Sequence, residues 1–450
     1  MKHLIKRIVI VGGRAAGPAA AAKARRENPG AAITMIEAGK YISTGTCEIP
    51  YLVSGEVRSA GEIVFFTPEQ FKQRYDVEVL TGTTVTGISS RERVIKVEQN
   101  GANYIINYDR LVLATGARQR LHPQFPPELK NVSYVRSIES AERLLDSVKP
   151  GGGKWLIVGA SYAGIEFSEA MVKLGKEVLL IEKDSLPAPG FDPEIRELIK
   201  EVLVKNGVEF LGNAPEIKVF TSGESVSKIK IDGRLIEVEG VIVNTGIDPE
   251  TGLAKKAGLE LGSKGGIKVD NRMRTSDQYI FAAGDCVELK EMVTGRHVIL
   301  PQATFARDGG YVAGANAAGG NDFMYPVLRN TAIRVFDKFA TKTGKCMKTL
   351  DELRIPYRTV TAMADGIINV MPGARKVFGK LITGQEGRIL GAGFFGGPEV
   401  SGYCDLIALA IKSGIKAQDL RHGNYNYTPT LSPFKNIIEA LAIKASGRNR

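Results

Sequence analysis

Cys47 has the sequence surroundings of a reactive thiol. It is followed by Glu48-Ile49-Pro50-Tyr51, and proline is favoured in the first turn of a helix. Cys47 would then lie at a helix N-terminus, where the helix dipole favours the nucleophilic thiolate. Burial without reactivity is the usual state of a cysteine outside a disulfide, so its neighbours leave both interpretations open. The other three cysteines lack such surroundings and are expected to be inert: Cys286, Cys346 and Cys404.

A glycine-rich turn near the N-terminus has the spacing of a dinucleotide-binding site. In IVIVGGRAAGPAAAAKARR, an apolar strand ends at Gly12, Gly13 leaves the backbone bare, and Gly17 allows the following helix to pack closely. The amides at the start of that helix can bind a pyrophosphate. Glu37, twenty residues after Gly17, ends the next strand at the place where an acid binds a ribose hydroxyl. Arg14 replaces the middle glycine of the pattern, so an ordinary turn between strand and helix is the alternative.

A second turn of the same kind occurs in WLIVGASYAGIEFSEAMVKLGKEVLLIEKD. Gly159 and Gly164 bracket the turn, and Ser161 holds its middle position. Glu182 ends the next strand, where an acid accepts a hydrogen bond from the 2′-hydroxyl of NADH and repels a 2′-phosphate. We therefore expect a preference for NADH over NADPH, which the adjacent Lys183 weakens. An ordinary turn is again the alternative.

Three further strand ends support nucleotide binding through their order along the chain. LVLATGA (111–117) and VIVNTGI (241–247) are matching strands that end in Thr-Gly, one after each glycine turn. IFAAGDC (280–286) ends in Gly-Asp, and Asp285 at such a strand end can hydrogen-bond a ribitol chain. Strands that alternate with helices predict two nucleotide-binding domains with parallel sheets. Between them, residues 76–113 alternate β-branched residues and predict an antiparallel meander.

Length and composition limit the class of protein. The chain has 450 residues, which suggests about three domains, and its 43% hydrophobic and 24% charged residues are typical of globular proteins. No apolar run is long enough to span a membrane, and the N-terminus does not predict a signal peptide. Four cysteines without close pairing predict neither a disulfide framework nor a metal site. A reducing cytoplasm fits best.

The formal net charge of +11 favours polyanionic partners. Nucleic acid is one such partner, but the chain has no basic run interleaved with aromatic residues. A phosphate-rich cofactor or substrate is the alternative that we favour. We therefore expect a small-molecule substrate, with neither nucleic acid nor a membrane as a partner.

The order of these motifs between residues 8 and 325 resembles that of the FAD- and pyridine-nucleotide-dependent disulfide oxidoreductases. STGTCEIPYL (43–52) is similar to the branch with a single redox cysteine, because Leu52 stands where other members have a second cysteine. That branch contains coenzyme A disulfide reductase, NADH oxidase, NADH peroxidase and persulfide reductase. The resemblance implies an α/β fold with two Rossmann-like domains and an α+β C-terminal dimerisation domain. The implied boundaries are 1–119 with 246–325 for FAD, 120–245 for NAD and 326–450 for dimerisation.

The resemblance also implies which residues bind the cofactors. FAD would be bound by residues of the glycine turns and two acids: Gly12, Gly13, Ala16, Gly17, Glu37, Ala114, Thr115, Gly116, Gly284 and Asp285. NADH, or NADPH, would be bound by a second set: Gly159, Ser161, Tyr162, Gly164, Glu166, Glu182 and Gly246. Electrons would pass from NADH through FAD to Cys47, which exchanges with a disulfide.

Oxidase and peroxidase members of the branch usually carry a histidine at the fourth position of the first turn. Ala15 stands there, so oxygen or peroxide chemistry lacks its expected acid–base group. NADH oxidase or peroxidase and polysulfide reductase remain alternative functions. A flavoprotein electron-transfer subunit for a protein partner is a further alternative, although that role needs no thiol.

The segment NYNYTPTLSPFKNIIEALA (424–442) resembles the family segment whose tyrosine reaches into the partner subunit's active site. It implies a homodimer in which Tyr427 donates a proton to the departing thiolate. A second family tyrosine is missing, since Val370-Met371 precede the Pro-Gly turn. The implied substrate is a disulfide or persulfide of coenzyme A, although Tyr75 stands where the reductases have a lysine. Its implied contacts are Ala19, Lys23, Arg26, Ser43, Thr46 and Lys435.

Overall fold

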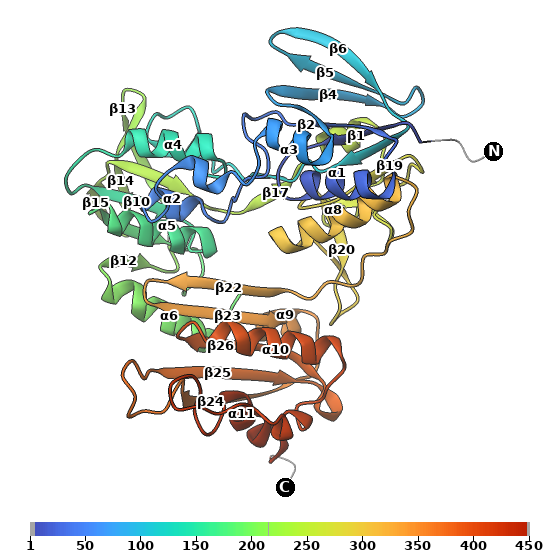
Figure 1. The fold of residues 1–450 in the computed structure, drawn as a ribbon. Coiled ribbons are helices and arrows are strands. Elements are labelled where there is room, and N and C mark those ends of the chain that lie inside the picture. The colour runs from blue at the N-terminus through green and yellow to red at the C-terminus, as the bar shows by residue number, and fades with distance from the viewer. Residues whose placement is uncertain (1–4, 215, 448–450) are drawn as a thin grey trace. The chain divides into compact units, whose positions relative to one another are not determined.

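The computed structural model describes residues 5–214 and 216–447, which form two compact units (Figure 1). The first unit contains the residues up to Arg120, Arg136–Ile138 and Ile247–Val327. The second contains Leu121–Val135, Glu139–Gly246 and the residues from Leu328 onward. Most of the predicted NAD and dimerisation domains falls in the second unit, but Arg120, Arg136–Ile138 and residues 326–327 belong to the first. The boundary between the two predicted domains stays a prediction. No helix of the described chain is long and apolar enough to cross a membrane.

The first unit is built on a five-stranded parallel sheet. Its strand order is β19 (Ile280–Ala282), β7 (Arg110–Leu113), β1 (Arg7–Val11), β2 (Ala32–Ile36) and β3 (Glu78–Leu80). The last four residues of β1 and all of β19 are buried. Burial on both faces explains why these strands are continuous apolar runs in the sequence.

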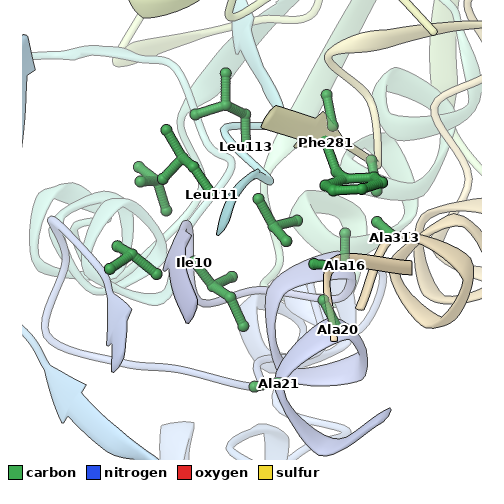
Figure 2. Close-up of a cluster of buried hydrophobic side chains, with 14 of the residues drawn as sticks. Ile10, Ala16, Ala20, Ala21, Leu111, Leu113, Phe281 and Ala313 are labelled. Atoms are coloured by element: carbon green, nitrogen blue, oxygen red, sulfur yellow. The ribbon is translucent and has the colours of Figure 1, made fainter. Parts of the chain in front are cut away.

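Helices α1 (Ala16–Glu27) and α8 (Ala303–Ala317) pack against each other and against this sheet. Glycines of α8 permit a close approach, because a Cβ at Gly310 would meet the carbonyl oxygen of Ala16. Figure 2 shows the shared core of sheet and helices, which includes Ile10, Ala16, Ala20, Ala21, Leu111, Leu113, Phe281 and Ala313. This packing holds the N-terminus of α1 at the carboxyl end of β1.

The predicted meander over residues 76–113 is only partly correct. Strands β3 and β7 at its two ends belong to the parallel sheet, because alternating β-branched residues indicate strands but not their partners. The antiparallel part contains β4 (Thr83–Ser89), β5 (Val94–Gln99) and β6 (Ala102–Asn107). The remaining elements of this unit are short: α2 (Ile49–Val53), η1 (Ala60–Ile63), α3 (Pro68–Tyr75), β8 (Ala117–Gln119), β17 (Ile247–Pro249), α7 (Gly252–Lys256), β18 (Ile267–Lys268), β20 (Val287–Lys290) and β21 (His297–Val298).

The second unit contains another five-stranded parallel sheet. Its strand order is β12 (Val208–Leu211), β11 (Glu177–Ile181), β10 (Lys154–Val158), β16 (Gly240–Val243) and β9 (Val132–Ser133). The helices and the small antiparallel sheet that go with it are α4 (Ile138–Ser147), α5 (Tyr162–Lys173), α6 (Pro193–Lys205), β13 (Lys218–Ser222), β14 (Ser225–Ile231) and β15 (Arg234–Glu237).

The C-terminal part of the second unit is an antiparallel sheet with helices. Its strand order is β22 (Asn330–Val335), β23 (Lys338–Gly344), β26 (Ile389–Gly396), β25 (Lys376–Thr383) and β24 (Arg358–Asp365). Its helical elements are α9 (Met347–Glu352), η2 (Gln385–Gly387), α10 (Val400–Lys412), η3 (Asp419–His422) and α11 (Ile437–Ser446). The buried Nζ of Lys380 on β25 lies 2.7 Å from the carboxylate of Glu194 and so connects this sheet to α6. The predicted α/β fold with two Rossmann-type sheets is confirmed.

Candidate active site

The first glycine turn connects β1 to α1. Gly12 has a φ of +110°, and a Cβ there would meet the carbonyl oxygen of Ala114. A Cβ at Gly17 would meet the carbonyl oxygen of Gly12, so both positions require glycine. Helix α1, which begins at Ala16, has no side-chain cap and no acidic residue in its first turn. Its N-terminal amides are therefore available to an anion such as a diphosphate.

Glu37 is held against this turn by backbone amides. One carboxylate oxygen accepts a hydrogen bond of 2.7 Å from Gly13, and the other accepts one of 2.8 Å from Gly39. A Cβ at Gly13 would approach the Cβ of Glu37 to 2.9 Å, so a glycine lets the acid lie against the turn. The carboxylate is thus fixed at the end of β2, where a ribose hydroxyl is expected.

The turns after β7 and β19 lie at the same sheet edge, because both strands run parallel to β1. The amide of Ala114 donates to the carbonyl of Val11 at 2.7 Å. The hydroxyl of Thr115 donates to the carbonyl of Glu250 at 2.6 Å, and Gly116 follows with a φ of +72°. The structure therefore gathers the predicted FAD-binding residues, including Gly284 and Asp285, at one edge of one sheet.

Two arginines that sequence reasoning did not assign lie next to Asp285. Nη2 of Arg136 is 2.7 Å from the Asp285 carboxylate, and Nη1 of Arg14 donates to the carbonyl of Arg136 at 3.3 Å. Burial raises the pKa of Asp285, and the positive charges of Arg136 and Arg14 oppose that shift. No local pattern could identify Arg136, because it lies 149 residues from Asp285 in the sequence.

The second glycine turn, between β10 and α5, repeats the geometry of the first. Gly159 has a φ of +96°, and a Cβ there would lie 2.5 Å from the carbonyl oxygen of Asn244. A Cβ at Gly164 would meet the carbonyl oxygen of Gly159. Ser161 precedes the first residue of α5, and Gly246 has a φ of +113° in the turn after β16.

Glu182 corresponds to the acid of the first turn. It is buried, and its carboxylate accepts a hydrogen bond of 2.8 Å from the amide of Ala160. Lys183 is exposed and forms no ion pair with any residue in the described ranges. The fixed carboxylate suits a ribose hydroxyl, while the adjacent cation could accommodate a phosphate. The preference for NADH over NADPH therefore stays a prediction.

Buried polar groups surround the second turn. Burial raises the pKa of Glu166 to about 7, the charge of Glu169 adds to this shift, and Arg334 opposes it. Burial also raises the pKa of Tyr162, whose ring lies 5.8 Å from that of Phe191. The side-chain nitrogen of Asn244 is buried and has no hydrogen-bond partner in the described part of the chain. A buried unsatisfied donor of this kind fits a bound nucleotide, and sequence reasoning missed it although Asn244 lies in the VIVNTGI motif.

Cys47 is exposed on a loop attached to the first glycine turn. The amide of Ser43 in this loop donates to the carbonyl of Gly13 at 2.7 Å. Helix α2 begins two residues after Cys47, with Pro50 in its first turn, as the sequence predicts. Because α2 has only five residues, its dipole effect on the thiol is smaller than that of a long helix. An exposed thiol therefore lies on a loop that is hydrogen-bonded to the first glycine turn.

The other three cysteines differ from Cys47 in their surroundings. Cys286 is buried, its thiol lies 3.3 Å from the carbonyl oxygen of Ala283, and burial raises its pKa. Burial also raises the pKa of Cys404 to about 12. Cys346 is half-buried, with its sulfur 3.4 Å from the hydroxyl of Thr349. Raised thiol pKa values agree with the prediction that Cys286 and Cys404 are inert.

Most residues predicted to contact the substrate lie in the first unit. On α1, Ala19 is buried, Lys23 forms ion pairs of 3.3 Å with both Glu27 and Asp322, and Arg26 is exposed. The guanidinium of Arg26 lies 5.8 Å from the ring centre of Tyr311. Ser43 and Thr46 are half-buried in the Cys47 loop. Tyr75 is half-buried, and its ring lies 4.8 Å from that of Phe71, so its side chain packs against the core.

Tyr427 and Lys435 lie in the second unit, in the segment before α11. Tyr427 is 50% exposed, and its ring lies 5.7 Å from that of Phe434. Lys435 is exposed as well. The amide of Ile368 donates to the carbonyl of Pro429 at 3.4 Å, which places the Val370-Met371 loop beside the same segment. Tyr425 instead packs inward and donates to the carbonyl of Leu420 at 2.7 Å.

Comparison with known proteins identifies the family to which this chain belongs. Residues 6–310 match the pyridine nucleotide-disulphide oxidoreductase family. The chain is 34% identical over 442 residues to an NADH oxidase of Methanocaldococcus jannaschii, with 98% of each chain covered. It is 29% identical over 448 residues to an NAD(P)H coenzyme A polysulfide/persulfide reductase of Pyrococcus horikoshii, again with 98% of each covered. The solved NAD-dependent persulfide reductase of A. fulgidus has a TM-score of 0.94 at 34% identity, over 98% of this chain and 83% of that one.

The chain therefore belongs to the pyridine nucleotide-disulphide oxidoreductases. It is an NAD(P)H-dependent flavoprotein oxidoreductase, and the predicted family, enzyme class and cofactors are confirmed. The two glycine turns fit these cofactors, since each combines a turn that only glycine can form with a fixed acid. The role of Cys47, the substrate and the oligomeric state stay predictions.

Proposed function

We propose that the chain transfers electrons from NAD(P)H through FAD to Cys47, which reduces a disulfide or persulfide of coenzyme A. The proposal rests on the exposed thiol of Cys47 in a loop that is hydrogen-bonded to the FAD turn. The names of the relatives from Pyrococcus horikoshii and A. fulgidus support this class of substrate. We place the reaction in the cytoplasm, where a reducing environment keeps a single redox thiol available.

FAD, when bound, supplies the two-electron transfer from NAD(P)H. The Cys47 thiolate attacks one sulfur of the substrate, the S–S bond breaks, and one thiolate leaves while Cys47 enters a mixed disulfide. Two electrons then break the mixed disulfide, release the second thiol and return Cys47 as a thiolate. Ala15 offers no acid–base group beside the first turn, so disulfide reduction is favoured over oxygen or peroxide reduction.

We propose that the enzyme is a homodimer in which Tyr427 of one subunit protonates the departing thiolate of the other. Large apolar side chains gather in the segments that carry Tyr427 and its neighbouring loop: Val370 is 81% exposed, Leu431 73% and Phe434 82%. Exposed apolar side chains of this density are typical of an interaction surface. Sedimentation equilibrium is expected to give a dimer, and a fully active monomer at assay concentration would contradict the proposal.

The proposed substrate can be tested through its phosphates. Coenzyme A carries a 3′-phosphate and a pyrophosphate, which fixed cations can bind. Replacing Arg26 and Lys435 with alanine is expected to raise KM for coenzyme A disulfide about tenfold, with kcat/KM for a small uncharged disulfide unchanged. Lys23→Ala is expected to have a smaller effect, because Glu27 and Asp322 already balance its charge. Steady-state kinetics with NADH on both disulfides measure the difference.

Two exposed lysines on α7 provide the control for this experiment. Lys255→Ala combined with Lys256→Ala removes the same amount of charge from exposed positions of the first unit and should leave both KM values unchanged. Equal losses on both disulfides in the Arg26 and Lys435 variant, or no loss on either, would exclude the phosphate contacts. A general thiol–disulfide reductase would then be the remaining function.

A further inference from the structure

Arg14 departs from the dinucleotide-binding pattern at the place where that pattern has its middle glycine. The corresponding residue of the second turn is Ser161, which is small. A long side chain at this position must either point away from the ligand that the turn binds or contact that ligand. Because Arg14 is half-buried, its side chain does not simply extend into solvent.

The contacts of Arg14 leave most of its hydrogen-bonding capacity unused. Nη1 donates to the carbonyl oxygen of Arg136 at 3.3 Å, which is long for a hydrogen bond and involves a neutral acceptor. No carboxylate within the described ranges forms an ion pair with Arg14. A guanidinium has five N–H donors in a planar arrangement that matches a phosphate.

The charges around Arg14 do not balance. Asp285 is paired with Arg136 at 2.7 Å, so Arg14 adds a further positive charge at a partly buried place. The N-terminus of α1, two residues after Arg14, contributes its positive dipole end and has no acid in its first turn. An anion is the group that would balance this excess.

We infer that Arg14 binds the pyrophosphate of FAD and so replaces the backbone contact that the missing glycine would permit. The diphosphate lies at the helix N-terminus in this type of turn, within reach of a side chain two residues before the helix. The hydrogen bond to Arg136 then orients the guanidinium beside Asp285. Arg14 is thus a cofactor-binding residue rather than a defect of the turn.

The test is FAD affinity of the apoprotein, measured by quenching of flavin fluorescence on reconstitution. Arg14→Ala is expected to raise the Kd of FAD about tenfold, and Arg14→Lys should retain part of the affinity. ADP and adenosine serve as competing probes, since ADP contains phosphates and adenosine does not. Arg14→Ala should weaken competition by ADP about tenfold and leave that by adenosine unchanged.

Arg91→Ala is the matched control, because Arg91 is an exposed arginine of the same unit without an ion pair in the described chain. Its Kd for FAD should equal that of the wild type. Arg14→Gln keeps a donor for the Arg136 carbonyl but removes the charge, so it should also raise the Kd of FAD about tenfold. This variant keeps the test possible if the alanine variant does not fold. Wild-type affinity in Arg14→Gln, tighter binding in Arg14→Gly, or equal losses for ADP and adenosine would each overturn the inference.

Discussion

Replacing Cys47 with serine is expected to abolish disulfide reduction while NADH still reduces the flavin. Disulfide exchange needs an attacking thiolate, and a serine hydroxyl cannot form the mixed disulfide. Loss of an attacking nucleophile is expected to lower turnover of coenzyme A disulfide by at least about 10³-fold. Hydride transfer to the flavin needs no thiol, so its stopped-flow rate should match that of the wild type. Thiol release and flavin absorbance, followed in the same sample, separate the two steps.

Cys346→Ser is the control for this experiment, because Cys346 is half-buried and lies outside the first unit. That variant should retain full disulfide turnover. Full turnover in Cys47→Ser would exclude the thiol mechanism. If neither protein reduces any disulfide but both reduce a protein acceptor, the flavoprotein electron-transfer function is the correct one.

The parts of the site that the sequence predicted are those set by local backbone geometry. Gly12 and Gly159 both have positive φ, and a Cβ at either would collide with the neighbouring strand's carbonyl. Each turn is followed at a similar spacing in the sequence by an acid, Glu37 or Glu182, whose carboxylate accepts a hydrogen bond from an amide of that turn. Such constraints leave a fixed spacing of residue types, which a sequence pattern can detect.

The parts that it missed depend on contacts between distant segments. Arg14 and Arg136 meet across 122 residues, and no spacing rule connects them. Lys23 was predicted to bind phosphate, yet Asp322 lies beside it only because α1 packs against α8. The unsatisfied nitrogen of Asn244 is likewise a consequence of burial in the folded sheet. Tertiary packing decides these contacts, and local sequence carries little information about it.

Replacing Gly159 with alanine is expected to impair the predicted NADH site and to leave the predicted FAD site intact. Gly159 has a φ of +96°, and the added Cβ would lie 2.5 Å from the carbonyl oxygen of Asn244. The turn must shift, which displaces the amides and the Glu182 carboxylate that are predicted to bind the nucleotide. A displacement of about 1 Å lowers the rate of flavin reduction by NADH about 10²-fold. Stopped-flow absorbance measures this rate.

Because the predicted FAD-binding residues lie in the other compact unit, the Gly159→Ala protein should purify with a full complement of flavin, and dithionite should still reduce it. Gly175→Ala is the matched control: Gly175 also has a positive φ, +76°, but a Cβ there would meet no atom within 4 Å. Backbone strain without collision costs about 1 kcal/mol of stability and leaves the nucleotide turn in place. Gly175→Ala should therefore reduce flavin at the wild-type rate. A comparable loss of the flavin-reduction rate in both variants would mean that backbone strain, and not the shape of the turn, limits NADH binding. Loss of flavin from the Gly159→Ala protein would mean that this turn binds FAD and not NADH.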